Sequence, residues 1–317
     1  MYNEHYRHGA GKRQRSERMN VQMSLQGQKN PSKRRQQVQR YWLIIGLVAV
    51  LAAAGILSGF YFIGKNGDAD SKEISLTRQQ EELWRKAGEE AGTEVETADE
   101  HLERIRMEAT MQGYPEGVIE LLDKNPATVK YVEDDGEKQG QIFAEDIGDD
   151  YVDGQIPLLI QWDERWGYAP YGTSVVAVSG CGPTCMAMVV CGLTHDPTVT
   201  PAVTAAYGTA NHYVDEENNT YWAFMSEAGA NWGLSCYSGF LSEQQLAAEL
   251  LAGHPVICSM GPGDFTQNGH FIVMTGYENG QIRINDPFSE ENSARTWTYA
   301  QIQGQTRAMW VYSLAGQ

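Results

Sequence analysis

The chain has 317 residues, a net charge of −17 and five cysteines. This length provides for one globular domain of about 200 residues with additional segments, because a single core seldom grows beyond about 250 to 300 residues. The odd number of cysteines excludes a domain in which every cysteine is paired within the chain.

Residues 1–40 carry ten Lys and Arg residues against two Asp and Glu, whereas the remainder carries fourteen against thirty-nine. The segment is also rich in Gln, Ser and Asn, so we expect a disordered basic tail. Such a tail can bind nucleic acid or anionic lipid. Because an apolar segment follows, membrane lipid is the expected partner and nucleic acid is not.

Residues 41–63 contain no charged side chain and have aromatic residues at both ends. A helix of this length crosses a hydrocarbon core of about 30 Å. A cleaved signal peptide is the alternative, but the long preceding tail and the long apolar stretch argue against it. We therefore expect a single-pass transmembrane helix with a cytoplasmic N-terminus and an extracytoplasmic remainder, because basic segments stay in the cytoplasm.

Two connecting segments follow. Residues 64–112 are charged and Glu-rich, with apolar residues too sparse for a core, which predicts a helical stalk; a self-associating coiled coil is the alternative. Residues 113–155 are predicted to dock onto the next domain and connect to it. Within them, Val118, Leu121 and Leu122 have the spacing of one helix face, and an extended piece is expected to follow that helix.

Residues 156–317 are predicted to form the globular domain. Helical patterns follow Cys181 and occur in SEQQLAAELLAG, and strand patterns come later, in PVICSM, HFIVMTGY, QIRIND and AMWVYSL. Helices that precede strands favour an α+β fold over a doubly wound sheet, in which the two would alternate.

Cys181 is the candidate nucleophile. In SGCGPTCMAMVV it stands between two glycines and just before a proline, which is tolerated only in the first turn of a helix. Free amides and the helix dipole stabilise a thiolate at that position. The alternative is a buried structural cysteine, which is our interpretation of Cys185 and Cys191. The flanking glycines favour function for Cys181 because they permit close approach of another backbone or a substrate.

A thiolate nucleophile needs an imidazole, and the imidazole needs a group that orients it. His195, His212 and His254 lie in turn-like sequence and are predicted to be surface residues. His270 begins the strand HFIVMTGY, at a junction of loop and sheet where catalytic groups are often placed. It is therefore the candidate base, with a buried structural histidine as the alternative.

The length of the turn after the His270 strand determines which residues of the next strand lie on the same face of the sheet as His270. A three-residue turn ending at Gly280 would place Asp286 opposite Ile272, on the face of His270, whereas a two-residue turn would place it on the other face. The catalytic hypothesis therefore predicts the three-residue turn. Asp286 before a proline can also be a simple turn residue, and Asn285 is the candidate on the opposite face.

An oxyanion also requires hydrogen-bond donors, and the Cys181 amide can supply one. Gln161 is the candidate for the second, although its spacing alone favours a surface glutamine in a polar patch. Cys181 and Cys185, four residues apart, raise the alternative of a zinc site. Because no compact second pair of ligands exists, neither a metal nor a cofactor is expected.

Together, IPLLIQWDERWGYAPYG, SGCGPTCMAMVV, GHFIVMTGY and NDPFS resemble the extracellular relatives of the bacterial double-glycine leader peptidases, cysteine-peptidase family thirty-nine, within the papain-like group. The resemblance implies a papain-like fold with Cys181, His270 and Asp286 as catalytic residues and Gln161 as an oxyanion residue. The segment YPEGVIELLDKNP is similar to one that precedes the domain in Gram-positive members. Nothing in the chain resembles the transporter and ATPase parts of the leader peptidases, which puts double-glycine cleavage in doubt.

The sequence therefore predicts a membrane-anchored extracytoplasmic cysteine peptidase or amidohydrolase. Its expected partner is a peptide or protein substrate, with cell-wall peptides among the candidates. The alternative is a catalytically inactive peptide- or wall-binding module on the same fold. Aromatic residues expected to be exposed favour that alternative: Trp162, Trp166, Tyr168, Tyr171 and Trp222.

Overall fold

The computed structural model describes residues 96–316. The predicted basic tail, the transmembrane segment 41–63 and residues 64–95 of the predicted stalk lie outside this range. Within residues 96–316, none of the helices has the length and apolar character required to span a bilayer.

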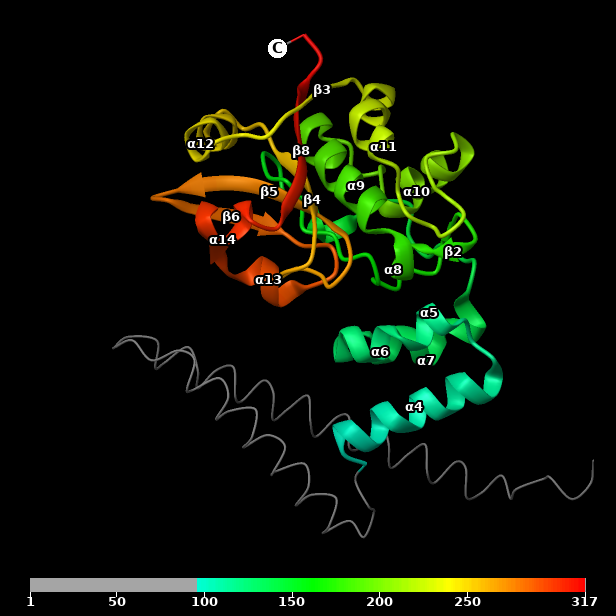
Figure 1. The fold of residues 1–317 in the computed structure, drawn as a ribbon. Coiled ribbons are helices and arrows are strands. Elements are labelled where there is room, and N and C mark those ends of the chain that lie inside the picture. The colour runs from blue at the N-terminus through cyan, green and yellow to red at the C-terminus, as the bar shows by residue number, and fades with distance from the viewer. Residues whose placement is uncertain (1–95, 317) are drawn as a thin grey trace, which may run out of the picture. The chain divides into compact units, whose positions relative to one another are not determined.

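The described part begins with a group of helices, drawn in cyan and blue-green in Figure 1. They are α4 (Ala98–Gln112), α5 (Glu116–Ile119), α6 (Leu121–Lys124), the 3-10 helix η1 (Pro126–Thr128) and α7 (Val129–Lys138). Thr97 opens α4 with a capping box, and Gly113 ends it in the left-handed conformation at φ +75°. The extended piece predicted after Val118–Leu122 is wrong, because residues 129–138 form α7.

This helical segment packs on the domain that follows it. Val118, Leu121 and Leu122 are buried, as predicted, in a cluster that also contains Ile105 and Ala109 of α4. On the other side of the cluster lie residues of the domain: Tyr168, Val175, Ala177, Val178 and Phe288. The helices α4 to α7 therefore share one apolar core with the part of the domain next to Cys181.

The domain has a helical part that precedes most of its sheet. After the hairpin of β1 (Pro170–Tyr171) and β2 (Ser174–Val175), this part comprises α8 (Val176–Ser179), α9 (Cys181–Thr194), α10 (Pro201–Ala210), α11 (Trp222–Glu227) and the 3-10 helix η3 (Ala228–Trp232). Helix α9 is buried along most of its length because its sequence is apolar on every side.

A six-stranded antiparallel sheet completes the domain, with strand order β3-β8-β4-β5-β6-β7. Its strands are β3 (Leu234–Ser238), β4 (Val256–Met260), β5 (His270–Glu278), β6 (Gln281–Asn285), β7 (Thr296–Trp297) and β8 (Thr306–Leu314). The remaining helices are η2 (Gly148–Asp150), α12 (Glu243–Leu251), α13 (Glu290–Ala294) and α14 (Tyr299–Gln303). The predicted α+β class with an antiparallel sheet is confirmed.

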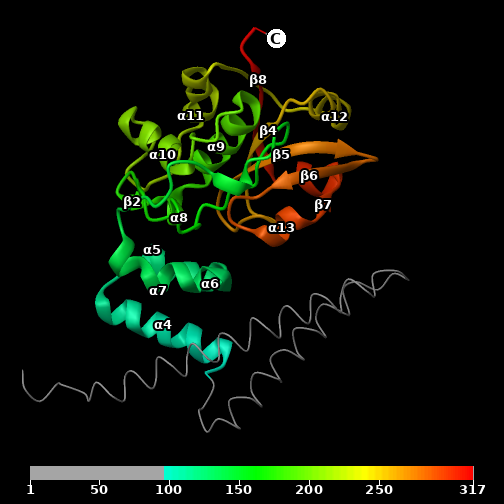
Figure 2. The ribbon, with the colours of Figure 1, turned by 180° about the vertical axis from the view of Figure 1, so that it is seen from behind.

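The sheet separates two apolar cores. One face packs on α9 through Ile257, Phe271 and Val273, and the other contributes Cys258, Ile272 and Met274 to the core with α12 and α14. Figures 1 and 2 show α9, α10 and α11 on one side of the sheet and α12 and α14 on the other. The alternation along β5 is that of a strand buried on both faces.

The hairpin between β5 and β6 differs from the prediction. Glu278 pairs with Gln281, so the turn has two residues, Asn279 and Gly280, with φ of +51° and +79°. The predicted three-residue turn is therefore wrong. Asn-Gly favours this tight turn because both positions need positive φ, and its twist matches that of the strands.

An irregularity farther along the hairpin returns Asp286 to the face of the sheet that the catalytic hypothesis requires. Met274 pairs with Ile284 and Gly276 with Arg283, so Thr275 is an additional residue in β5. Beyond this bulge Val273 pairs with Asn285, which places Asp286 on the face of Ile272 and hence of His270. The expected juxtaposition of His270 and Asp286 is present, but a bulge inside the strand produces it.

Candidate active site

Cys181 lies at the first position of α9, where the backbone approaches its neighbours closely on both sides. A Cβ atom on Gly180 would lie 2.5 Å from the Val176 carbonyl oxygen, and one on Gly182 would lie 2.6 Å from Thr220 Oγ1. Both glycines are therefore required by packing. Cys181 is partly exposed, and its amide belongs to the first helical turn, where N–H groups lack partners within the helix.

His270 and Asp286 form a buried ion pair. His270 Nε2 lies 2.7 Å from Asp286 Oδ1, and the two side chains are 9% and 1% exposed. Because Nε2 faces the carboxylate, Nδ1 remains for the thiol. Burial alone would lower the pKa of His270, but Asp286 and the neighbouring Cys181 thiol raise this pKa to about 10.

The Asp286 carboxylate is held by three further donors. The Phe288 and Ser289 amides lie 2.9 and 3.3 Å from Oδ1, and Asn292 Nδ2 lies 2.9 Å from Oδ2. Burial alone would raise the pKa of Asp286, but His270, Asn292 and the Phe288 amide hold it below the ordinary value. Asp286 is thus a turn residue, as one interpretation of Asp-Pro expected, and also the partner of His270.

Sequence reasoning missed Asn292. The only signal for it is Ser289, a preferred helix N-cap residue, whose Oγ accepts from the Asn292 amide at 3.1 Å. Asn285 contacts other residues: its Nδ2 donates to the Ile156 and Pro157 carbonyls at 3.1 and 2.9 Å. It attaches the start of the domain to β6.

Gln161 is buried between the segments that carry Cys181 and Asp286. Its Nε2 donates to the Ala177 carbonyl at 2.8 Å, and its backbone N–H donates to the Pro287 carbonyl at 2.7 Å. The residue is 3% exposed, so the surface glutamine is ruled out. Nε2 carries a second proton that can serve another acceptor, and Oε1 is buried without a hydrogen-bond partner among the described residues.

Tyr171 and Thr220 are two further neighbours of Cys181 that the sequence did not indicate. The Tyr171 hydroxyl lies 2.7 Å from Thr220 Oγ1, and Thr220 packs on Gly182. Burial, and to a smaller extent the Cys181 thiol, raise the pKa of Tyr171. The phenol therefore stays neutral beside the thiol.

The other histidines lie outside this group, and Cys185 lies one helical turn after Cys181 within α9. His195 and His212 are exposed, and His254 is partly exposed and lies 2.7 Å from Glu249. Cys185 and Cys191 are buried in α9, as predicted, and all five cysteines are free. No set of three or more His, Cys, Asp or Glu side chains within residues 96–316 is arranged to hold a metal ion.

The expectation of many exposed aromatic residues is largely wrong. Trp166, Tyr168 and Tyr171 are fully buried, and Trp162 is half-buried with its Nε1 3.0 Å from the Phe288 carbonyl. Of the five, only Trp222 is exposed, at 51%. Tyr168 is covered by the helical segment, whereas Trp166 and Tyr171 belong to the apolar core around α9.

Comparisons with known proteins identify the family of the domain. A model of the Peptidase C39 like family matches residues 154–315, just over half of the chain. No curated protein matches the chain. Among solved structures, the peptidase domain of Streptococcus ComA, a bifunctional ABC transporter involved in quorum sensing, is 20% identical, with a TM-score of 0.33. That match covers 44% of this chain and 93% of the solved peptidase domain.

Two further structures are similar. A putative C39-like peptidase from Bacillus anthracis is 16% identical with a TM-score of 0.35, and the match covers 51% of this chain and 96% of the other. A double-glycine motif protease from an AMS/PCAT transporter, solved in complex with the leader peptide, is 14% identical with a TM-score of 0.27. That match covers 42% of this chain and 86% of the other. The extent of the family match over residues 154–315 shows that the chain belongs to the Peptidase C39 like family.

Proposed function

We propose that the domain is a cysteine peptidase or amidohydrolase that cleaves a peptide or amide bond with Cys181, His270, Asp286 and Gln161. The observation that carries this proposal is the buried His270–Asp286 pair, 2.7 Å apart, next to a partly exposed thiol at a helix N-terminus. Burying two charged groups is costly, and such pairs are common at functional sites.

In the proposed reaction His270 already holds the proton of the Cys181 thiol, because it is charged at neutral pH, and the resulting thiolate attacks the substrate carbonyl carbon. The Cys181 amide and the free Nε2 proton of Gln161 stabilise the oxyanion. His270 then protonates the leaving nitrogen, the C–N bond breaks, and a thioester remains on Cys181. Water, deprotonated by His270, hydrolyses the thioester and regenerates the thiol. Asp286 orients the imidazole and stabilises its charged form throughout.

We also propose that the enzyme is anchored by residues 41–63 and acts outside the membrane. The uncharged 23-residue stretch and the basic segment before it support this topology. The peptide complex of the AMS/PCAT protease makes peptides the first substrates to test. A protease-protection experiment on intact cells, with an epitope at each end of the chain, tests the orientation: only the C-terminal epitope should be degraded.

The activity is tested by comparing secreted and surface peptides from cells that produce the wild type, Cys181→Ala or Cys185→Ala. Cleavage products should disappear with Cys181→Ala and persist with Cys185→Ala, because Cys185 is fully buried away from solvent. Thermal unfolding of the purified chains controls for misfolding. If the wild type binds peptides but yields no product that depends on Cys181, the domain is the binding module and not a peptidase.

A further inference from the structure

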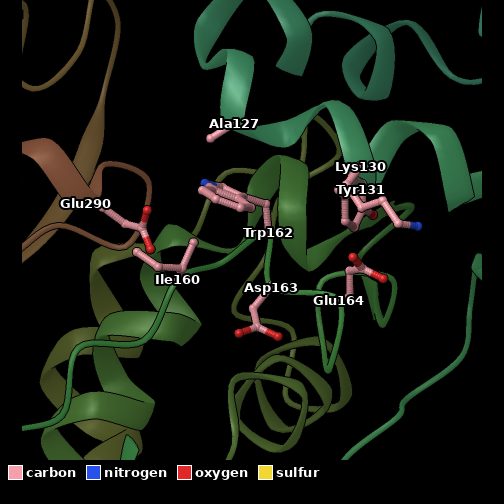
Figure 3. Close-up of a pocket in the computed structure, with 8 residues that line it drawn as sticks. All are labelled: Ala127, Lys130, Tyr131, Ile160, Trp162, Asp163, Glu164 and Glu290. Atoms are coloured by element: carbon pink, nitrogen blue, oxygen red, sulfur yellow. The ribbon is translucent and has the colours of Figure 1, made fainter. Parts of the chain in front are cut away.

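A cavity of about 260 Å³ lies between the helical segment and the domain. Figure 3 shows Trp162 at its centre, with Glu290 and Ile160 on one side and Lys130, Tyr131 and Glu164 on the other. Its volume is below the roughly 300–1,000 Å³ of pockets that enclose a drug-sized ligand. It is therefore suited to a single side chain. Eight residues line it: Ala127, Lys130, Tyr131, Ile160, Trp162, Asp163, Glu164 and Glu290.

Cys181, His270 and Asp286 do not line the cavity, but several lining residues are close neighbours of the proposed catalytic groups along the chain. Ile160 and Trp162 flank Gln161 in the chain, and the Trp162 indole donates to the Phe288 carbonyl at 3.0 Å. Glu290 is the first residue of α13, the helix whose Asn292 holds the Asp286 carboxylate. Both walls of the cavity therefore continue directly into the segments that carry the proposed catalytic groups.

The charges around the cavity leave one carboxylate available. Asp163 is paired with Arg165 at 2.6 Å, and Glu164 is paired with Lys138. Lys130, the only cation in the lining, is bound to Asp134, and in Figure 3 its side chain extends away from Trp162. Glu290 is exposed and has no ion-pair partner among the described residues. An indole and a free carboxylate thus face the same space, an arrangement that attracts a cation.

We propose that this cavity binds the basic side chain, Lys or Arg, of a residue on the leaving-group side of the scissile bond. The inference rests on the proposed peptidase function and specifies its substrate. His270 must protonate the leaving nitrogen, so the leaving chain passes the side of the site formed by His270 and Asp286. The Glu290 wall lies on that side because it follows Asp286 through a short turn.

The first test uses the full chain and a library of peptides produced by digesting a proteome. Cleavage sites, identified by mass spectrometry as those absent with Cys181→Ala, should be enriched in Lys and Arg within the residues after the cut. For one such peptide, norleucine replaces the basic residue, which removes the charge and keeps the aliphatic stem. The wild type should prefer the basic peptide by about three- to tenfold in kcat/KM.

Glu290→Gln should reduce that preference to below about twofold, whereas Glu291→Gln, which removes an exposed carboxylate that does not line the cavity, should leave it unchanged. Cleavage without enrichment of basic residues, or a preference that Glu290→Gln leaves intact, overturns the cavity assignment while the peptidase function stands. If the wild type shows no cleavage that depends on Cys181, that result counts against the peptidase function instead.

A second measurement does not depend on catalysis. The full chain with Cys181→Ala is labelled with 5-fluorotryptophan, and the Trp162 resonance is identified by its loss in Trp162→Phe. Titration with N-acetyl-lysine methylamide should shift this fluorine signal, and the norleucine analogue should not. If both compounds shift it equally, or neither does, the cavity does not select a basic side chain and the proposal fails.

Discussion

Among the cysteines, only Cys181 combines access with an activating environment. Burial raises the pKa of Cys185 and Cys258, raises that of Cys191 to about 12 and raises that of Cys236 to about 11. Cys181 is partly exposed beside an imidazole that carries a charge at neutral pH. These four other thiols are therefore matched controls within the same chain.

We expect iodoacetamide to alkylate Cys181 of the folded protein near neutral pH at least about tenfold faster than any other cysteine. Peptide mass spectrometry over a time course measures each rate. His270→Ala should slow the reaction at Cys181 alone, because the thiolate loses its counter-ion. Equal rates for Cys181 and Cys236 would show that the thiol is not activated.

Asp286 sets the pH range in which His270 remains charged. Its carboxylate opposes the effect of burial and keeps the pKa of His270 above the ordinary value of 6.5, at about 10. In Asp286→Asn the burial remains and the negative charge is gone, so this pKa should fall. The alkaline limb of the kcat/KM profile should move to lower pH, and the maximum should fall by about 10²- to 10⁴-fold.

The profile is measured with one peptide substrate across neutral and alkaline pH. Glu291→Gln serves as the control, since it removes a carboxylate on the nearby helix α13 that forms no hydrogen bond or ion pair with His270 or Asp286 in the described structure. An alkaline limb that stays in place in Asp286→Asn would mean that the carboxylate does not govern the charge of His270.

At the scale of elements, the β5–β6 hairpin shows what a sequence pattern can and cannot predict. A continuous apolar run located β5, alternating apolar residues located β6 and Asn-Gly located the turn, because these signals are local. The bulge at Thr275 adjoins Gly276, and a single glycine inside a strand is a local signal for a bulge that an argument from turn length does not use. Turn length alone therefore predicted the wrong turn, although the prediction that His270 and Asp286 lie together was correct.

Gly280 carries the conformation that this turn requires. Its φ is +79° and a Cβ atom there would meet nothing within 4 Å, so Gly280→Ala tests backbone strain alone. We expect this variant to lose about 1 to 2 kcal/mol of unfolding free energy. Gly304→Ala is the matched control, because its added Cβ is also unobstructed and its φ is −68°. Equal stability of the two variants in denaturant titrations would contradict the strained turn.

At the scale of the whole molecule, the helices α4 to α7 were the least predictable feature. Their apolar residues and the docking of residues 113–155 onto the next domain were predicted, but the domain residues that they contact were not, because a short helix shows a sequence pattern for its own face only. In the structure they cover Ala177 and Val178, just before Cys181, and Phe288, just after Pro287. Asn125 Nδ2 also donates a hydrogen bond to the Phe288 carbonyl at 3.1 Å, so a polar contact joins the helices to the segment after Asp286.

The helices approach the domain closely at Gly117, where a Cβ atom would lie 2.9 Å from Val178 Cγ1. Gly117→Val should force α5 away from α8, and overpacking of this kind costs about 1 to 3 kcal/mol. Because α8 leads directly into Cys181, the variant should also lower kcat/KM and slow alkylation of Cys181. Gly239→Val is the control, since its Cβ would meet nothing within 4 Å and its φ is not positive.

Adding Val178→Ala to Gly117→Val tests whether the loss comes from this contact, because it removes the methyl groups that the new side chain meets. Stability and alkylation rate should then recover in part, although Val178→Ala alone lowers stability. If Gly117→Val unfolds at a lower temperature while Cys181 reacts and turns over at the wild-type rate, the helices stabilise the fold without positioning the nucleophile. Recovery of both properties together would show that the helical segment affects the position of Cys181 through α8.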